Sequence, residues 1–495
     1  MNPSRFTPCL TYRALLLAAV SALAGGCALH TPPREVSAAV PPQWFAPYPL
    51  ADAPDTLPHN GRLTDLTQWW MQQGDPLLVE LIASAQAVSP SIASARSRIE
   101  QARATRAAAG AALTPALDAS ASSSRTRSPP TAPGASALAT TAQAGLQASW
   151  EMDLFGGKQA SRNAAIERLA GAQAQWHDAR VSVAAEVANQ YYSYTSCREL
   201  ENITRADAAS RQETARLTDL SMKAGFTAPA TAALARASAG DASARATEQA
   251  ARCELDVKAL VAFSALPEPD LKKKLALAQV VRAQEAPILI ATVPADALAQ
   301  RPDIFNAARE VAAASEEIGS AQAERYPRLG LSGSIGTSRV RSGGVSTDFN
   351  TWSIGPLSLT VPLFDGGRRA ADVDAARARY DEAAASYRSR VRQAVREVEE
   401  ALVKLQSTAA RRADVQTAVD GYRASFSGTE ALYKTGLASL VELEDSRRTL
   451  LTAQTTLASL QLSRSTAWVS LYRAMGGGWT PAENAAVDAA GLPAR

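Results

Sequence analysis

The sequence is poor in the residues that fill compact cores and in those that catalyse reactions. Aromatic residues make up 6% of the 495 residues, and the three histidines are His30, His59 and His177. A large globular core needs bulky side chains to reach the packing density of proteins. The alanine-rich composition therefore favours long helices that pack closely. Metal-ligand spacings, nucleophile elbows and phosphate loops are also missing, so we expect no catalytic residue, no metal and no enzyme.

A strong charge of one sign and a long apolar run are missing as well. The chain has 51 Lys and Arg against 48 Asp and Glu, a formal charge of +3. Such a balance excludes the broad basic surface that nucleic-acid binding needs, so no nucleic-acid partner is expected. No stretch reaches the ~18 consecutive apolar residues of a membrane helix. Any membrane crossing must therefore be made of strands.

The N-terminus is typical of an export signal. Arg5 and Arg13 precede or flank a mostly apolar run, Ala14–Ala24, that is too short to span a bilayer. We predict that residues 1–26 form a signal peptide and are removed. Cys27 follows two glycines, and this pattern resembles the lipobox of bacterial lipoproteins, in which the thiol receives a diacylglyceryl group. A covalent lipid on Cys27 is then the one non-protein group expected, with no other cofactor.

The lipobox pattern departs from the usual one at two places. Ala24 stands where leucine is preferred, and Leu23 lies one position too early. The alternative is an ordinary signal peptide in which Cys27 has no role. Under the lipoprotein interpretation, residues 27–64 form a lipid-anchored N-terminal segment.

Self-similarity at a fixed period organises the rest of the chain. Four motifs recur in the same order with an offset of about 210 residues. The pairs begin at Pro90 and Pro302, Leu113 and Tyr326, Asp153 and Pro362, and Lys223 and Lys434. Independent coincidences would not share one offset, so the chain is a tandem duplication. We predict a first repeat over 65–275, a second over 276–479, and a disordered tail over 480–495.

Each repeat is predicted to hold a helical run, a β-hairpin and a long helix. The helical run of the first repeat is expected over Pro76–Leu113. The hairpins are expected over 113–154 and 327–364, because residues near their ends alternate with the period of two of a half-buried strand. Serine-, glycine- and proline-rich stretches at Ser128–Ala135 and Ser342–Asp348 are the expected loops.

The long helices are expected over Lys158–Lys223 and Arg368–Lys434, where no proline occurs. Their apolar residues recur every three or four positions, as in a coiled coil. At 1.5 Å per residue, each helix reaches about 100 Å, several times the width of a small domain. Two core helices of a soluble bundle are disfavoured by that length.

Each long helix ends at a glycine, Gly225 or Gly436, where the left-handed conformation permits a tight reversal. Cys197 and Cys253 are equally distant from Gly225, 28 residues before and after it. An antiparallel hairpin that turns at Gly225 therefore places both cysteines at the same height. Since disulfides persist in oxidising compartments, we predict a Cys197–Cys253 disulfide. Two unpaired buried thiols are the alternative.

Two strands per repeat give four strands per chain, which cannot close a barrel by themselves. An open sheet edge is not tolerated in lipid, so closure requires several chains. Three copies supply twelve strands, enough for a water-filled lumen. The fold class predicted is thus a mixed α/β membrane protein, a tandem-repeat protomer of a trimeric 12-stranded β-barrel that is continued by a long α-helical barrel.

Several motifs resemble signatures of the TolC-like outer-membrane factors, in the lipoprotein branch that serves resistance-nodulation-division efflux pumps. These are Trp150–Gly156, Gln300–Ile304, Val361–Gly367 and Met475–Trp479. The resemblance covers nearly the whole chain after the signal. It implies a homotrimer, lipid-anchored in the bacterial outer membrane with its helices in the periplasm. It also implies a periplasmic adaptor and an inner-membrane pump as partners, with small-molecule efflux as the function.

The resemblance further implies a gate just after the second hairpin glycine. By position, Val441 resembles the apolar gate ring, Asp445 the acidic ring and Arg448 its basic partner. Valine stands where a larger leucine is common. Three copies of Asp445 on one axis repel each other unless they are paired. The alternative is a solvated charged helix face with ordinary surface pairs.

The hairpin tips are the predicted docking surface for the adaptor. Gly225 and Phe226 form one tip, and Gly436 and Leu437 form the other. Exposed apolar residues there suit contacts with helical hairpins of a partner, although simple turn chemistry also explains them. A tunnel for type I protein secretion is the alternative function. A lipid-anchored adaptor is disfavoured because it lacks the two strand pairs of the repeat.

Overall fold

The structure is a computed structural model, and it describes residues 29–46, 69–128, 137–278 and 298–479. The chain divides into two compact units. Unit 1 consists of the described parts of Met1–Ser37, Arg98–Ala172 and Asn306–Tyr387. Unit 2 holds the described parts of Ala38–Ser97, Gln173–Phe305 and Arg388–Arg495. Each unit draws on both predicted repeats, because the long helices run through both, and each unit is described by itself.

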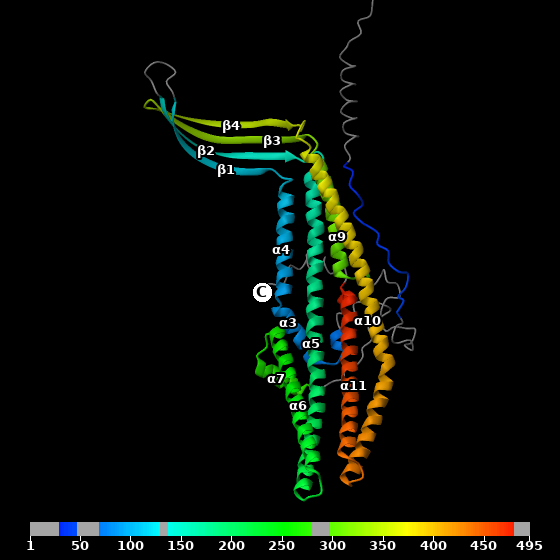
Figure 1. Cartoon of the computed structure of the whole chain (residues 1–495). Helices are drawn as coiled ribbons and strands as arrows, with labels where there is room; N and C mark the ends of the chain where they lie inside the picture. Colours follow the sequence, from blue (N-terminus) through cyan, green and yellow to red (C-terminus); the bar gives the residue numbers. More distant parts are fainter. Residues whose placement is uncertain (1–28, 47–68, 129–136, 279–297, 480–495) are drawn as a thin grey trace, which may run out of the picture. The chain divides into compact units, whose positions relative to one another are not determined.

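The same series of elements occurs twice along the chain (Figure 1). The first series is α4 (Pro90–Ala111), β1 (Ala116–Ser128), β2 (Ala137–Met152), α5 (Gly157–Lys223) and α6 (Pro229–Ser264). The second is α9 (Pro302–Ala323), β3 (Arg328–Ser342), β4 (Val345–Thr360), α10 (Arg368–Lys434) and α11 (Leu440–Ala474). Helices α5 and α10 have 67 residues each and end where the sequence predicts.

Shorter elements surround these series. They are α2 (Trp69–Gln72), α3 (Pro76–Val88), α7 (Glu268–Leu277) and a 3₁₀ turn, η2 (Gly476–Gly478). The predicted repeat boundary at 275 thus falls inside α7. The single helical run expected from Pro76 is broken at Ser89, because Pro90 lacks the N–H that would continue the helix.

No single described helix has both the length and the apolar composition to cross a membrane. The helix pair α3 and α4 passes that test only when taken together, and it is bent by 48° at its break.

The strands form one antiparallel sheet in the order β1-β2-β3-β4. Strand β2 of the first repeat pairs directly with β3 of the second, so the two repeats share the sheet. The loop expected over Ser342–Asp348 is wrong, because β4 already begins at Val345. Gly343 and Gly344 alone make the turn, with φ of +57° and +84°. Two left-handed residues are what a two-residue hairpin turn requires.

The register gives the sheet one apolar and one polar face. Ile335 pairs with Leu146 on β2 and Trp352 on β4, and residues in cross-strand register share a face. All three side chains are exposed. The polar face carries serine, threonine and glutamine, among them Ser120, Ser122, Gln143, Gln147, Ser334 and Ser353. The alternation predicted for strands wet on one side is therefore present in all four strands.

The main core of unit 2 is built from aromatic and aliphatic side chains of both repeats. Tyr472 of α11 stacks on Trp69 with ring centroids 5.2 Å apart, and its edge meets Trp70 at 4.8 Å. Arg301 is buried nearby, where it pairs with Asp303 and Glu397 and donates to the carbonyl of Ala474. The few bulky residues of the chain are thus concentrated here.

His177 makes the stability of this core depend on pH. Burial, followed by the Arg180 cation, lowers the pKa of His177 to about 4. The unfolded chain takes up this proton near pH 6.5 and the folded chain only near pH 4, so stability falls as the pH falls through this window. We expect a loss of up to about 3 kcal/mol. Melting of the detergent-solubilised protein between pH 7.5 and 4.5 measures it.

Two variants separate this effect from general acid sensitivity. His177→Phe keeps a ring beside Trp176 and Trp479 and should show a smaller drop in melting temperature than the wild type. His30→Gln, at an exposed histidine, should behave as the wild type does. An unchanged pH profile in His177→Phe would exclude His177 as the cause.

Candidate functional site

The two hairpin tips of unit 2 have the same backbone structure. The N–H of Phe226 donates to the carbonyl of Ser221, and that of Leu437 to the carbonyl of Leu432, each at 2.9 Å. The preceding glycines have φ of +80° and +79°, which makes both turns glycine-ended helix caps. The Phe226 and Leu437 side chains are 86% and 77% exposed. The structure thus places two apolar side chains in solvent at equivalent positions.

Helix α11 starts immediately after the second tip. The Ser439 hydroxyl accepts from the N–H of Glu442, whose carboxylate accepts in return from the N–H of Ser439. The Glu442 carboxylate accepts a hydrogen bond from the backbone N–H of Ser439 and a second from the Ser439 hydroxyl. The backbone bond first, and then the side-chain bond, hold the pKa of Glu442 below its usual range. A capping box of this kind fixes where the helix begins, and it therefore fixes the angular position of every later side chain on α11.

The three predicted gate residues lie on one exposed face of α11. Val441 is exposed, and one turn later Asp445 forms an ion pair with Arg448. The side chains of Asp445 and Arg448 are 62% and 75% exposed. Solvent-exposed pairs contribute little to stability, so in one protomer this pair does not hold α11 in place. Its carboxylate and guanidinium remain accessible to other groups.

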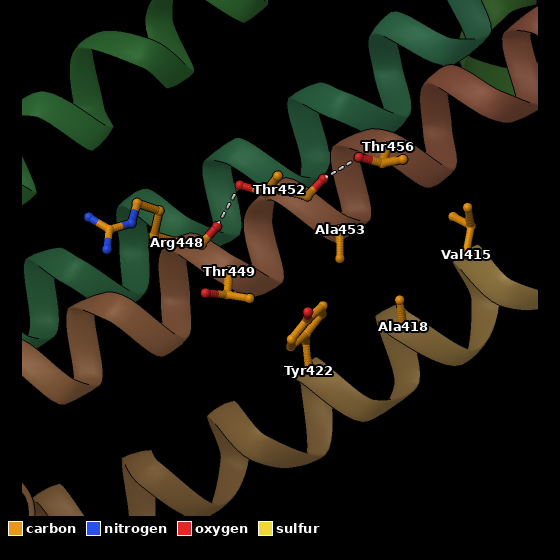
Figure 2. Close-up of a pocket in the computed structure, with 8 residues that line it drawn as sticks. All are labelled: Val415, Ala418, Tyr422, Arg448, Thr449, Thr452, Ala453 and Thr456. Atoms are coloured by element: carbon orange, nitrogen blue, oxygen red, sulfur yellow. Dashed lines mark hydrogen bonds between the residues drawn. The ribbon is translucent and has the colours of Figure 1, made fainter.

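An open groove of about 390 Å³ follows this pair between α10 and α11 (Figure 2). Val415, Ala418 and Tyr422 line its α10 side. On the α11 side, the hydroxyls of Thr452 and Thr456 donate to carbonyls one turn back, each at 2.8 Å. The α11 residues that line the groove beyond Arg448 are threonines and an alanine, so this wall is uncharged.

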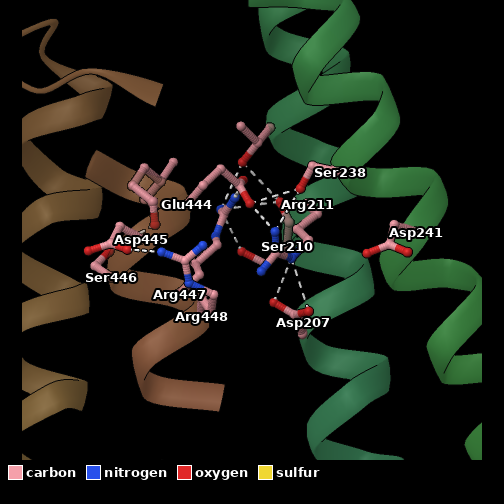
Figure 3. Close-up of polar contacts among 12 residues, drawn as sticks. Asp207, Ser210, Arg211, Ser238, Asp241, Glu444, Asp445, Ser446, Arg447 and Arg448 are labelled. Carbon is pink, nitrogen blue, oxygen red and sulfur yellow. Dashed lines mark hydrogen bonds and ion pairs between the residues drawn. The ribbon is translucent and has the colours of Figure 1, made fainter. Parts of the chain in front are cut away.

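Sequence reasoning missed a second, buried set of charges on an adjacent face of α11 (Figure 3). Arg211 of α5 donates to both oxygens of Asp207, at 2.9 and 3.0 Å, and pairs with Glu444 of α11. Arg447 pairs with the other oxygen of Glu444 at 3.0 Å. We call Asp207, Arg211, Glu444 and Arg447 the buried charge cluster. It joins the hairpin of one repeat to that of the other.

Hydroxyl groups extend the hydrogen bonding of this cluster, while the buried Nε of Arg447 has no hydrogen-bond partner among the described residues. Ser238 of α6 accepts from Arg211 at 2.7 Å and donates to Glu444 at 2.8 Å. Arg447 donates to the hydroxyls of Ser210 and Thr214, at 2.9 and 2.8 Å. Burial, and then the neighbouring Arg211 cation, lowers the pKa of Arg447. The cluster has two positive and two negative groups, so removal of either carboxylate leaves an excess of buried positive charge.

A signal for this cluster was present in the sequence. Arg447 follows Leu440 and Leu443 at helical spacing, and all three side chains are buried. A charged residue at a buried position of a coiled coil needs a partner. Its partner Glu444 lies three residues earlier, but Arg211, which shares that carboxylate, lies more than 230 residues earlier, and no sequence pattern connects the two.

Apolar and polar contacts next to the cluster involve all four hairpin helices. Leu440 and Leu443 pack with alanines of α5 and α6, and Phe426 and Tyr433 of α10 pack against them. The hydroxyl of Tyr433 lies 3.0 Å from that of Thr218 on α5. The two hairpins are therefore held together next to the exposed Asp445–Arg448 pair.

The predicted disulfide is present. Cys197 of α5 and Cys253 of α6 are bonded, with their Cα atoms 5.5 Å apart. It links the arms of the first hairpin at a level 28 residues from Gly225. The predicted lipid site, Cys27, lies outside the described residues, as do the signal peptide and the tail.

The described residues offer no place for a bound metal. Nowhere in the described ranges do three or more His, Cys, Asp or Glu side chains gather in a way that could hold an ion. The chemistry of the site is thus that of charge pairing and packing between helices.

Known sequences are similar to this chain over nearly its whole length. A solvent efflux pump outer membrane protein of Pseudomonas putida, SrpC, is 29% identical over 466 residues, 93% of this chain and 97% of the relative. The pyoverdine export outer membrane protein OpmQ of Pseudomonas aeruginosa is 28% identical over 478 residues, 95% and 98% of the two chains.

Solved structures share the fold over nearly their whole length. The Campylobacter jejuni CmeC outer membrane channel matches with a TM-score of 0.80 at 24% identity, covering 94% of this chain and 99% of that one. The open state of the Neisseria gonorrhoeae MtrE outer membrane channel matches with a TM-score of 0.74 at 25% identity, covering 91% and 98%. These matches confirm the predicted fold class of a tandem-repeat outer-membrane channel.

Both repeats match one sequence family. Residues 81–263 and 293–477 match the outer membrane efflux protein family, and the two segments correspond to the two halves of the duplication. This family consists of transport channels of the outer membrane, not of enzymes. Because the match covers most of the sequence in both halves, the chain belongs to the outer membrane efflux protein family.

Proposed function

We propose that this chain is one protomer of the exit duct of a tripartite efflux pump, a passive outer-membrane channel for drugs or other small molecules that is gated at its hairpin tips. One observation supports the gate above all. The exposed Asp445–Arg448 pair and the Glu444–Arg447 part of the buried charge cluster lie on adjacent faces of the same turns of α11. Any movement of α11 that displaces the exposed pair must therefore also disturb the buried cluster.

The proposal includes a homotrimer that meets a periplasmic adaptor and an inner-membrane resistance-nodulation-division pump. Relatives are named as outer membrane components of solvent, toluene and antibiotic efflux pumps, which supports a multi-component system. Phe226 and Leu437, exposed at matching tips, are the residues proposed to contact the adaptor. Apolar side chains at the ends of helical hairpins suit packing against other helices.

We also propose that Cys27 carries the lipid. The chain just after it is fixed to α9 in unit 1, since His30 exchanges two backbone hydrogen bonds with the Gln322 side chain, at 3.0 and 2.8 Å. Gln322 lies six residues before β3 begins. His30 is the third residue after Cys27, a reach of about 10 Å. A lipid on Cys27 therefore lies near the end of the sheet where the helices begin.

Protein secretion is the alternative, and one experiment separates the two functions. A strain that lacks this channel is complemented with the wild type, and both drug accumulation and the secreted proteins are measured. Efflux predicts that the deletion raises accumulation of an amphiphilic dye and that the secreted proteins stay unchanged. The opposite result would support a type I secretion tunnel.

Removal of the exposed carboxylate tests the gate. Asp445→Ala deprives Arg448 of its partner and removes a charge from the proposed constriction, so we expect single-channel conductance in planar bilayers to rise several-fold. Asp420→Ala is the matched control, because Asp420 pairs with Arg423 at the same spacing and similar exposure on α10. Equal conductance of Asp445→Ala and the wild type would place Asp445 outside the constriction.

A further inference from the structure

The turn-bearing end of the sheet carries an excess of positive charge. Arg125 and Arg127 of β1 and Arg339 and Arg341 of β3 are all exposed there. Among the described residues of that end (123–128, 137–142 and 338–349), Asp348 is the one acidic residue, and the sequence of 129–136 has none. Four arginines against one aspartate give this end of each protomer a net charge of +3.

The register places these arginines on the apolar face of the sheet. Ala142 is paired with Arg339, and Thr140 is paired with both Arg125 and Arg341. Ala142 and Thr140 lie an even number of residues from Leu146 on β2. These two residues, and the arginines paired with them, therefore share the face of Leu146. Arg125 and Arg341 flank Thr140 on the two neighbouring strands, about 10 Å apart at the usual strand spacing.

Two of these arginines keep their charge available. Arg339 donates to both carboxylate oxygens of Asp348, at 2.6 and 2.8 Å, and is neutralised by it. Within the described ranges, neither Arg125 nor Arg341 forms an ion pair with an acidic side chain. Their two guanidinium groups can therefore bind an anion between them or one anion each.

The distance of these arginines along the strands from the apolar part of the face agrees with the position of a lipid headgroup. On β3, the apolar face runs from Leu329 to Ile335, about 20 Å, and Arg339 and Arg341 follow about 13 and 20 Å beyond Ile335. The helices join the strands at the opposite end. Since the helices lie in the periplasm, the arginines lie at the outer surface of the membrane, beyond the band that contacts acyl chains.

We propose that Arg125 and Arg341 bind the phosphate groups of an acylated glycolipid in the outer leaflet, with its acyl chains lying along the apolar face that ends at Ile335 and Trp352. Guanidinium groups bind phosphate oxygens in a bidentate manner. The apolar face on the membrane side of the arginines selects an amphiphile over a free anion. A channel cargo is not the occupant, because cargo would pass along the opposite, polar face of the sheet.

Binding of lipid A to the full-length protein, purified in dodecyl maltoside, tests this site. Native mass spectrometry would compare bisphosphorylated lipid A with its dephosphorylated form and with inorganic phosphate. Arginines near anionic lipid contribute about fivefold each in affinity, so Arg125→Gln with Arg341→Gln should weaken binding about 30-fold. The matched control is Arg328→Gln with Arg392→Gln, at exposed or half-exposed positions away from the turn-bearing end of the sheet. This control should bind lipid A as the wild type does.

Each outcome decides the proposal. Equal binding by the glutamine pair and the wild type would overturn it, as would equal binding of the dephosphorylated lipid. Inorganic phosphate that binds as well as lipid A would show a free-anion site instead. If the glutamine pair does not fold, Arg125→Lys with Arg341→Lys keeps the charge, and retention of most of the affinity, with a steep loss between 50 and 300 mM salt, supports the site. Salt-independent binding by the lysine pair would contradict it.

Discussion

Glu444→Gln is expected to destabilise the hairpin region by about 3–5 kcal/mol and to raise single-channel conductance more than Asp445→Ala does. Glu444 is the carboxylate that pairs with both Arg211 and Arg447. Without its charge, two buried guanidinium groups share Asp207 alone. The cost of an uncompensated buried charge far exceeds that of a lost surface pair, so α11 should separate from α5 and α6. Melting temperature and planar-bilayer conductance measure the two effects.

A second substitution checks that charge balance is the cause. Arg447→Gln added to Glu444→Gln removes the surplus cation and leaves Asp207 and Arg211 as a balanced pair, so it should restore part of the lost stability. Glu213→Gln is the control, since Glu213 pairs with Arg216 on the exposed surface of α5 and its loss should change neither quantity. Wild-type melting and conductance in Glu444→Gln would mean that the cluster does not hold α11.

Removal of the disulfide is expected to have the next largest effect. Cys197→Ala with Cys253→Ala releases a covalent link between residues 56 apart in sequence. Loop-closure entropy gives an upper value of about 4 kcal/mol for such a loop, and native disulfides typically contribute about 2–4 kcal/mol. Because the bond joins α5 to α6, the loss should appear as earlier melting of the first hairpin. Thermal unfolding followed by limited proteolysis would locate it.

Reduction of the wild type provides the internal control. Treatment with dithiothreitol should lower its melting temperature to that of the alanine pair, and it should not lower that of the alanine pair further. Mass mapping without reduction should find Cys197 and Cys253 in one linked peptide pair. Two alkylated, unlinked cysteines would contradict the disulfide, and with it the alignment of the α5–α6 hairpin.

The fold was largely predictable because its signals are local or repeated. The glycine-ended reversals at Gly225 and Gly436 set the length of the hairpins, and the equal spacing of Gly225 to Cys197 and Cys253 was enough to pair the cysteines. The start of β4 was harder, since a serine- and aspartate-rich stretch favours a loop. The tight turn at Gly343 and Gly344 extends the ladder through that stretch.

The candidate site was only half predictable, because only part of it is signalled by local or repeated features of the sequence. Val441, Asp445 and Arg448 were implied by the family resemblance, which places the gate just after the second hairpin glycine. The buried charge cluster depends on the contact between α5 and α11, in different repeats, and sequence distance conceals it. Arg447 was visible as a charge at a buried helical position, with Glu444 three residues before it, but Arg211, which shares Glu444, was not. Tertiary partners of buried charges are the kind of information that periodicity does not carry.

The pairing of β2 with β3 has a consequence for the order in which the protein folds. Gly145 and Gly336 face each other in this ladder, 191 residues apart, whereas β1 finds β2 across a short connection. Contacts of such long sequence separation form slowly. Strand β2 must therefore remain without its second neighbour until β3, in the second repeat, has been exported. During that interval its edge is open to pairing with other chains, so passage across the periplasm is the stage at which this protein is most exposed to aggregation.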